Sequence, residues 1–412
     1  MGRVDVEMFV YNDVRRDSRV LREARSLASR DYRVRVVGRG AADLPAEETV
    51  DGFTIARTEA PGREGGPGSD SPWRPHRRGG IADRARWVIA YARDFRAWRA
   101  AALALAAARR VPSGGTRVWH GHDLTGLLPA TAARKRWGGS IIYDSHELYL
   151  EAGSAARLPS VLRRGLGRIE GARARSADAV ITVNDTIAQE LAGRYGMSMP
   201  SVVMNCPPAT DHVPPERSPL RAALGVGSRP IVMHHGGITE GRGIRQAVRA
   251  LAWLPPEVAL VVLGNGELVP DLRSLAEQPE NRDRLFLLPA VPVDALPAWI
   301  AGADVGLVTF EAVDLNNYYA SPNKLFEYLV QGIPSVVSDF PELRGIVAGN
   351  DLGVTCDPGD PEAVAAAISH LLNEAPEERK RRRQRCREAA ISKYSWERQE
   401  SVLHAVYDQL IA

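Results

Sequence analysis

The strongest constraint on the fold is an alternation of apolar, strand-like runs with amphipathic helical patterns, which occurs in two series along the chain. The runs of the first series are residues 4–11, 32–39, 116–120, 140–144 and 179–183. Those of the second series are residues 230–237, 259–266, 284–291, 303–310, 333–339 and 352–356. Strands that alternate with helices are typical of βαβ units, so each series predicts a parallel α/β sheet.

A proline-rich loop at residues 206–219 separates the two series. The chain has 412 residues, which is more than single hydrophobic cores usually reach. We therefore predict two doubly wound, Rossmann-like domains that face each other across a cleft. The expected parts are an N-terminal domain at 1–205, a hinge linker at 206–225, a second domain at 226–394, and a C-terminal helix at 395–412 that packs back toward the first domain.

Composition and charge exclude several classes of protein. The formal net charge is only +3, which argues against a nucleic-acid partner. The cysteines Cys206, Cys356 and Cys386 are far apart in sequence, which favours neither a disulfide framework nor a zinc site. No apolar stretch has the length of about 20 residues that a spanning helix needs, and the start of the chain does not have the pattern of a signal peptide. We expect a cytoplasmic protein.

Candidate ligand-binding residues follow the strand-like runs. In open parallel sheets, ligands bind at the carboxyl ends of the strands, where helix N-termini point toward them. Polar or glycine-rich turns occur at these ends, at residues 122–123, 144–147, 236–237 and 264–266. If the two domains face each other, one polar ligand can be held by both.

Two glycine-rich turns in the second half differ in what they indicate. Residues 234–243, HHGGITEGRG, combine four glycines with Arg242, a pattern that favours phosphate binding over a flexible surface loop. The Gly264-Asn265-Gly266 turn lacks the third glycine of the dinucleotide fingerprint. For that turn a plain strand-to-helix connection and a phosphate contact are both open, and an NAD site is not favoured.

Several motifs together resemble one enzyme family. In the second half they are the turn at 236–243, LGNGE, LLPAVP, ADVGLV and above all SPNKLFEYLVQGIPSVVSD at 321–339. In the first half they are NDVRRDSRVLREARSLA, HGHD and YDSHEL. This combination resembles the retaining GT-B glycosyltransferases of family four, in a branch that reads P-N-K-L-F-E-Y.

The resemblance implies transfer of a hexosyl-type residue from a nucleotide diphosphate sugar, with retention of configuration. UDP is the first choice of nucleotide and GDP the second, and the acceptor is a small molecule, a glycan or a lipid-linked molecule. Arg242 and Lys324 are expected to offset the charge of the diphosphate, and Glu327 to accept hydrogen bonds from the ribose. The remaining donor-binding candidates are Gly236, Gly237, Gly264, Gly266, Ala290, Val291, Ser321, Asn323 and Leu325.

The chain departs from the family pattern at two positions. Tyr319 stands where the first of two spaced glutamates is usual, and Gly237 stands where an arginine is usual. The P-N-K-L-F-E-Y branch is similar in both respects, so these departures do not indicate a dead site. For Lys324 and Glu327, the alternative is that both are exposed charges on an ordinary helix.

In the first half, the resemblance implies that His122 faces the donor sugar, whereas a structural role is as well supported for His120. The candidates for the acceptor side are Asp17, Asp123, Asp144, His146 and Glu147. Glu147 or Asp123 would be the proton acceptor. The same residue types cap helices, so helix capping is the alternative for this set.

The sequence favours no metal and no cofactor. An Asp-x-Asp pair, which could clamp a metal diphosphate, is absent from the sequence. We therefore expect Arg242, Lys324 and backbone dipoles to stabilise the leaving group electrostatically. Two other functions remain open, namely a nucleotide-sugar epimerase of the same architecture and an inactive homologue that acts as a binding partner.

Two further segments have two interpretations each. Trp87, Tyr91, Phe95 and Trp98 recur at helical spacing among arginines within residues 84–99. This stripe favours core packing, and an interfacial helix in peripheral contact with a membrane is the alternative. The basic run at 378–383 is interpreted as the solvated face of a helix.

Overall fold

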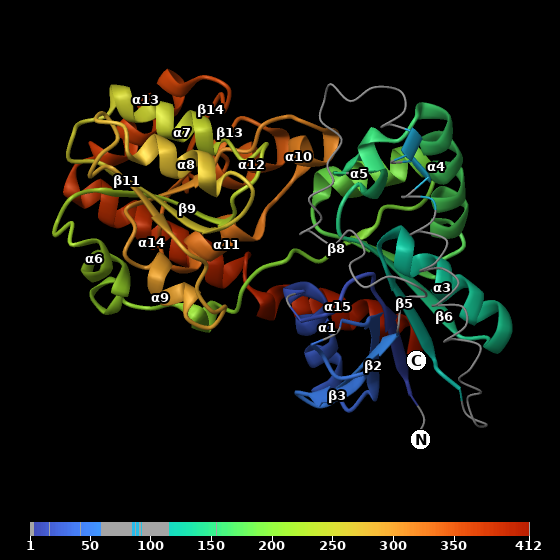
Figure 1. The fold of residues 1–412 in the computed structure, drawn as a ribbon. Coiled ribbons are helices and arrows are strands. Elements are labelled where there is room, and N and C mark those ends of the chain that lie inside the picture. Colours follow the sequence, from blue (N-terminus) through green and yellow to red (C-terminus); the bar gives the residue numbers. More distant parts are fainter. Residues whose placement is uncertain are drawn as a thin grey trace. The chain divides into compact units, whose positions relative to one another are not determined.

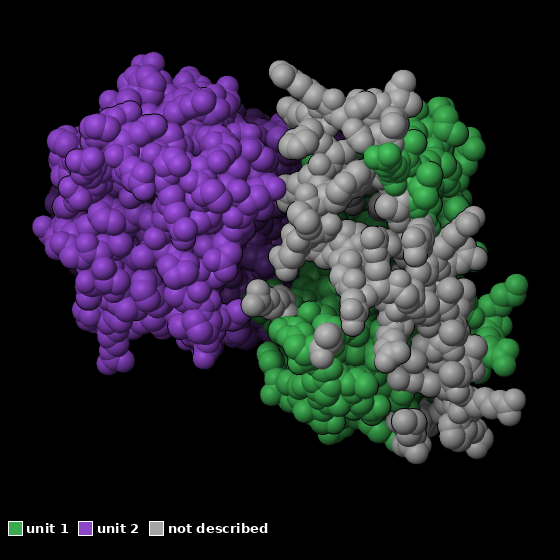
Figure 2. All heavy atoms as spheres, viewed as in Figure 1, with its two compact units in different colours: residues 1–183, 187–203, 400–412 green, residues 184–186, 204–399 purple. Residues whose placement is uncertain are grey.

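The structure is a computed structural model that describes residues 4–15, 17–41, 43–58, 85, 86, 88, 89, 92, 115–153 and 155–411. The chain divides into two compact units, which Figure 2 shows in different colours. Unit 1 comprises residues 1–183, 187–203 and 400–412, and unit 2 comprises residues 184–186 and 204–399. Each unit is built around its own sheet.

The sheet of unit 1 has the strand order β3-β4-β2-β1-β5-β6-β7-β8. Its strands are β1 (Val6–Phe9), β2 (Val34–Arg39), β3 (Glu47–Val50), β4 (Phe53–Thr58), β5 (Val118–His122), β6 (Ser140–Ser145), β7 (Ala179–Thr182) and β8 (Ser201–Val202). Neighbouring strands pair in parallel, except that β3 pairs antiparallel with β4. In the pairing of β5 with β6, His122 lies directly beside Asp144.

Unit 1 also contains several helices, which Figure 1 labels. They are α1 (Ser18–Ala28), α3 (Asp123–Trp137), α4 (Ser160–Ala174), α5 (Asp185–Tyr195) and α15 (Trp396–Ile411), with the short turns η1 (Tyr149–Glu151) and η2 (Ala155–Arg157). α1 begins after Asp17, whose carboxylate accepts a hydrogen bond from the Val20 N–H and so caps the helix. The residues of α15 from 400 onward belong to unit 1, where the Tyr407 hydroxyl lies 2.7 Å from His120 Nδ1.

The sheet of unit 2 is parallel throughout, with the strand order β11-β10-β9-β12-β13-β14. Its strands are β9 (Ile231–Gly237), β10 (Ala259–Asn265), β11 (Leu285–Leu288), β12 (Val305–Val308), β13 (Ser335–Ser338) and β14 (Gly353–Cys356). Its helices and turns are η3 (Ala209–Asp211), η4 (Pro215–Arg217), α6 (Pro219–Leu224), α7 (Ile244–Ala250), η5 (Leu251–Trp253), α8 (Val269–Ala276), α9 (Leu296–Ile300), α10 (Leu315–Tyr319), α11 (Asn323–Val330), α12 (Pro341–Val347), α13 (Pro361–Leu372) and α14 (Pro376–Ser392).

Apolar clusters lie on both faces of the unit 2 sheet. Successive side chains of a strand point to opposite faces, so Ile231 and Met233 belong to one cluster and Val232 to the other. The first cluster includes Phe326 of α11, and the second includes Ile368 of α13. Helices therefore cover both faces of the sheet, as in a doubly wound fold (Figure 1).

The predicted α/β fold with two parallel sheets is confirmed, and each predicted strand-like run overlaps a strand. The sequence did not indicate β3, β4 or the short β8. In unit 2, α7 directly follows the glycine-rich turn at 234–243, and after Ala250 the chain continues as the turn η5.

The interpretation of residues 378–383 as a solvated helix face is wrong for Arg382. Its side chain is buried against Asp351 and Glu374, and its Nη2 lies 2.7 Å from Glu374 Oε1. Burial and two carboxylate partners thus make this arginine part of the packing of α14.

The aromatic residues Trp87, Tyr91, Phe95 and Trp98 lie outside the described residues, so the two interpretations of that segment stay as predictions. Among the residues that the structure does describe, no helix combines the length and the apolar character needed to cross a membrane.

Candidate functional site

The carboxyl ends of β9 and β10 form a tight, glycine-dependent turn region in unit 2. Gly264 has a positive φ of 151°, and a Cβ there would lie 1.9 Å from the Gly236 carbonyl oxygen. A Cβ at Gly266 would lie 2.1 Å from the Ile238 carbonyl oxygen. These two glycines therefore let neighbouring backbone segments pack together, which explains the LGNG turn without a ligand.

Gly236 and Gly237 are exposed, in contrast to Gly264. A Cβ built at Gly236 would lie 3.9 Å from Lys324 Nζ, and one built at Gly237 would meet nothing within 4 Å. The backbone at this strand end is thus open to an approaching group beside the Lys324 ammonium.

Two cationic side chains meet the same aromatic ring in this region. Arg242 Cζ lies 4.1 Å from the centroid of the Phe310 ring, and Lys324 Nζ lies 5.7 Å from it. Both distances are within the range of cation–π contacts. Arg242 comes from the turn between β9 and α7, whereas Lys324 lies in the first turn of α11. The fold therefore brings together the two cations that the sequence predicted for the diphosphate.

Lys324 is buried, with 8% of its surface exposed, so its interpretation as an exposed helix charge is wrong. Its Nζ lies 3.1 Å from His234 Nε2. Burial, assisted by the nearby Arg242, lowers the pKa of Lys324 to about 7. Burial and Lys324 also hold the pKa values of His234 and His235 well below the usual range, so both histidines are neutral at pH 7.

Glu327 lies one turn further along α11 and keeps 24% of its side chain exposed. Its carboxylate is 3.5 Å from His235 Nε2. Because His235 is neutral, this contact is not an ion pair at pH 7. The carboxylate is thus accessible to solvent, and it lies on the same helix as Lys324.

The first turn of α11 offers fewer backbone donors than expected. Helix N-termini leave N–H groups without intrahelical acceptors, but the Leu325 N–H already donates to the Pro322 carbonyl oxygen at 3.0 Å. The Ser321 hydroxyl accepts a hydrogen bond of 3.0 Å from Asn184 Nδ2. Leu325 and Ser321 thus have structural contacts, and the predicted phosphate contact would fall to the backbone of Asn323 and Lys324.

The segment predicted to contact the base follows β11, which pairs with β10 at one end of the sheet order. Ala290 is exposed, whereas Val291 is half-buried and packs against the core cluster that contains Phe326.

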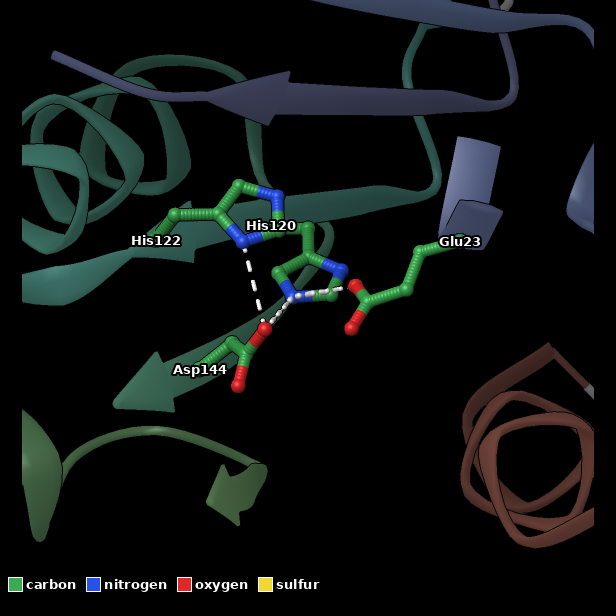
Figure 3. Close-up of side chains that lie close together, drawn as sticks. All are labelled: Glu23, His120, His122 and Asp144. Atoms are coloured by element: carbon green, nitrogen blue, oxygen red, sulfur yellow. Dashed lines mark hydrogen bonds and ion pairs between the residues drawn. The ribbon is translucent and has the colours of Figure 1, made fainter. Parts of the chain in front are cut away.

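A second polar cluster lies in unit 1, where β5, β6 and α1 meet (Figure 3). Arg19 donates to Asp144 through two nitrogens, with Nε 2.8 Å from Oδ2 and Nη2 2.7 Å from Oδ1. The same Nε lies 3.0 Å from Glu23 Oε1. Arg19, Glu23 and Asp144 are all buried. Burial raises the pKa of Glu23 well above its usual range, so the principal ion pair of this cluster is Arg19 with Asp144.

Two histidines of the cluster have opposite protonation states. His122 is fully buried, and its Nδ1 lies 3.2 Å from Asp144 Oδ2 and 2.9 Å from His146 Nε2. Burial lowers the pKa of His122 to about 3. For His146, burial is outweighed by the carboxylates of Asp123 and Asp144, which raise its pKa to about 10. A neutral imidazole and an imidazolium therefore lie side by side at pH 7.

The other acceptor-side candidates have structural contacts. Asp17 caps α1, as the alternative interpretation expected, and its Oδ2 accepts a hydrogen bond from Asn12 Nδ2 at 2.7 Å. Asp123 Oδ1 accepts a hydrogen bond of 2.9 Å from the His146 N–H. The Glu147 carbonyl oxygen accepts from the Ser145 hydroxyl at 2.8 Å.

Glu23, His120, His122 and Asp144 offer the ligand types of a metal site, with ligand atoms within 4.8 Å of one another. The guanidinium of Arg19 already contacts both carboxylates, however, and a metal cation there would be repelled by it. We therefore assign no metal to this cluster.

Sequence reasoning assigned no individual role to several residues of both clusters. Phe310, His234 and His235 adjoin the cations of unit 2, while Glu23 and Tyr407 adjoin the histidines of unit 1. One signal was available: Glu23 follows Arg19 by four residues on the face of α1 that also carries Val20, Ala24 and Leu27. Charged residues on an apolar helix face indicate a buried pair.

Curated proteins similar to this chain include two that are glycosyltransferases by name. A D-inositol 3-phosphate glycosyltransferase of Xylanimonas cellulosilytica is 28% identical over 293 residues, which cover 67% of this chain and 68% of that protein. A GDP-mannose-dependent alpha-(1-6)-phosphatidylinositol monomannoside mannosyltransferase of Mycolicibacterium smegmatis is 26% identical over 264 residues, covering 62% of this chain and 66% of that protein. The matches thus span about two thirds of each relative.

Solved structures share the whole fold. Sucrose-phosphate synthase of Thermosynechococcus elongatus matches with a TM-score of 0.76 and 18% identity, covering 99% of both chains. Anabaena HepE in complex with UDP matches with a TM-score of 0.70 and 14% identity, covering 99% of this chain and 100% of that one. At such identities the likeness shows the fold alone.

Family models match nearly the full length of the chain in two parts. Residues 17–208 match the model described as glycosyl transferase 4-like domain. Residues 217–392 match the model described as glycosyl transferases group 1. The matches fall in the order of the two sheets and leave only the ends and a short connection uncovered. This chain therefore belongs to the family-four glycosyltransferases of the GT-B fold.

Proposed function

We propose that this glycosyltransferase moves a hexosyl residue from a nucleoside diphosphate sugar to an acceptor hydroxyl, with retention of configuration and without a metal. The observation that carries the proposal is the placement of Arg242 and Lys324 on the Phe310 ring, beside the open backbone of Gly236. Two cations converge there on a backbone that leaves room for a ligand.

A diphosphate suits the electrostatics of this site. Lys324 has the half-buried Arg242 and two neutral histidines near it, and among the causes of its pKa shift only Glu327 favours the charged form. A diphosphate would restore the charge of Lys324 and accept hydrogen bonds from the first turn of α11. The same groups would stabilise the charge that develops on the diphosphate as the sugar leaves, which is the role a metal has in other architectures.

The proposed transfer proceeds on one face of the sugar. The bond from the anomeric carbon to the phosphate oxygen breaks, and a bond to the acceptor oxygen forms on the same side. We propose that the acceptor proton passes to the departing diphosphate, in place of Glu147 or Asp123 as the sequence suggested, so charge and protons balance without a covalent enzyme intermediate. Retention is proposed from the resemblance of the P-N-K-L-F-E-Y segment.

UDP is the first proposed nucleotide and GDP the second. HepE, a neighbour by fold, binds UDP in its solved complex, whereas the mycobacterial mannosyltransferase, a relative by sequence, is named as dependent on GDP-mannose, so the comparisons support either base. Glu327 is proposed to accept hydrogen bonds from the ribose, and the backbone of Ala290 and Val291 to contact the base. Family membership does not favour the epimerase alternative.

In unit 1 we propose that the cluster around Asp144 forms the acceptor side. His146 carries a positive charge beside Asp123, and the neutral His122 completes the cluster. Because Arg19 fixes Asp144 through two hydrogen bonds, the rings that contact Asp144 are held in place.

A thermal-shift screen against UDP, GDP, ADP and dTDP tests the donor site. A ligand at 100 times its dissociation constant stabilises the folded state by about 2.7 kcal/mol. We expect one of these nucleotides to raise the melting temperature of the parent protein and to have no such effect on Lys324→Met. The matched control is Lys380→Met, which removes an exposed lysine of α14 in the same unit. A parent protein that responds to none of them, or a Lys324→Met variant that responds fully, would refute the assignment.

A further inference from the structure

Unit 1 contains a cavity of about 540 Å³. It is lined by residues of α4, α5 and the turn η1. Five arginines line it, namely Arg163, Arg164, Arg168, Arg175 and Arg194, together with a single carboxylate, that of Glu151. A cavity with this lining is strongly cationic.

The one carboxylate is shared by two of the arginines. Glu151 lies 3.1 Å from Arg163 and 3.0 Å from Arg194. Arg164 directs its Nε to the Ser160 carbonyl oxygen at 3.3 Å. Within the part of the chain that the structure describes, neither Arg164 nor Arg168 has a carboxylate at ion-pair distance. The described residues of the protein therefore leave part of the positive charge of the cavity without a neutralising carboxylate.

The wall beside these arginines is closely packed. Gly167 and Gly171 line the cavity one helical turn apart on α4, where a Cβ at Gly171 would lie 2.6 Å from Tyr195 Cδ1 and a Cβ at Gly167 would lie 3.6 Å from Leu150 Cδ1. Tyr195 closes the wall, and its hydroxyl donates to the buried Glu170 at 2.8 Å. Tyr143 donates to the same carboxyl group at 2.6 Å. Buried hydrogen bonds thus hold the lining in place.

We propose that this cavity binds a phosphate-bearing anion. The planar guanidinium group donates two parallel hydrogen bonds to phosphate, and several arginines around one cavity can do so together. The proposed site lies in unit 1 and shares no residue with Arg242, Lys324 or Glu327 of unit 2. It is independent of the nucleotide-binding proposal.

The surface of α4 next to the cavity favours a phospholipid headgroup as the source of the phosphate. Val161, Leu162 and Ile169 are 71%, 45% and 45% exposed, and they lie on the same helix as Arg164 and Arg168. Apolar side chains interspersed with arginines are the composition of helices that lie in a membrane interface. A free phosphorylated metabolite offers the same phosphate without the membrane, and the two sources can be separated by experiment.

The first arm measures binding to vesicles of phosphatidylcholine with and without phosphatidylglycerol. The test variant is Arg164→Gln/Arg168→Gln. The matched control is Arg157→Gln/Arg173→Gln, which removes two exposed arginines of η2 and α4 that do not line the cavity. At about 1 kcal/mol for each basic residue near an anionic surface, we expect at least tenfold weaker binding of the test variant. The control should lose much less, and its circular dichroism and that of the test variant should match the parent.

The second arm measures binding of inorganic pyrophosphate by calorimetry. Pyrophosphate bound at Arg242 and Lys324 would contribute equally to the stoichiometry of all three proteins. Only a difference in stoichiometry between the proteins therefore reports on the cavity. If the cavity takes free phosphate, the parent and the control bind one more pyrophosphate than the test variant. If the test variant but not the control loses binding in one of the two arms, the proposal is supported, and that arm identifies the source of the phosphate. If the test variant loses binding in neither arm, or if the test and control variants lose binding equally, the proposal is overturned.

Discussion

Nucleotide binding should be coupled to proton uptake by Lys324. In the ligand-free protein the pKa of Lys324 is about 7, chiefly because the side chain is buried and secondly because Arg242 is near. A diphosphate against the ammonium favours the charged form, so the pKa rises in the complex. Affinity is therefore fully present below pH 7 and is lost as the pH rises from 7 toward the pKa of the complex.

The size of the effect follows from the two pKa values. If the complex restores the ordinary lysine pKa of about 10.4, the dissociation constant at pH 9 should be roughly 50 times that at pH 7. Proton uptake should be about half a proton at pH 7 and nearly one at pH 8.5. The terminal phosphate itself ionises near pH 6 and contributes little in this window.

Titration calorimetry of UDP, or of GDP if that is the nucleotide bound, measures both quantities when it is run in buffers of different ionisation enthalpy. Lys324→Arg is the informative variant, because arginine stays charged throughout this pH range and should remove the proton uptake. Lys380→Arg makes the same change at an exposed position and should behave as the parent. A parent dissociation constant that is constant from pH 7 to 9, with no proton uptake, would refute the reasoning.

Three other predictions concern single side chains. Arg242→Ala should lower kcat by roughly a hundredfold, as when one preorganised donor to a developing charge is removed; transfer at the parent rate would contradict this. Glu327→Gln should chiefly raise the donor KM, because ribose contacts are equal in ground and transition states, and steady-state kinetics with unchanged KM would rule the contact out. Asp144→Asn should lower the free energy of unfolding by roughly 3 to 5 kcal/mol in urea denaturation, because it leaves Arg19 buried without its charged partner. The more exposed carboxylate Glu190, changed to Gln, should cost less than about 1 kcal/mol, and equal losses would show that the Arg19 pair is not special.

The strands that the sequence indicated are those with continuous apolar runs. A strand buried on both faces must be apolar at successive positions, which makes it visible without other information. β3 has the sequence EETV, with side chains that are exposed or half-buried in alternation, so it carries no apolar run. The pairing of β3 with β4 depends on a partner strand that the local sequence does not specify. β8 has only two residues, which is too short for an apolar run.

The sequence predicted those residues of the candidate site that belong to recognisable motifs. Arg242 and Lys324 were expected to act together because of the family resemblance, and the structure places both on one ring. That this ring is Phe310, and that Lys324 lies against His234 some ninety residues away, depends on tertiary packing. The Arg19–Asp144 pair spans 125 positions, and only the adjacency of α1 and β6 creates it.

The two polar clusters differ in whether the protein itself neutralises their charge. In unit 1 the buried Arg19 is matched by Asp144, and the imidazolium of His146 is matched by Asp123, so charge is balanced within the cluster. In unit 2 Lys324 faces Arg242 and loses much of its tendency to hold a proton. A buried charge without compensation is costly, and such an arrangement persists where a ligand completes it. This contrast supports the proposal that the anionic part of the donor binds beside Lys324 in unit 2, and that the cluster around Asp144 in unit 1 has a role that needs no ligand charge.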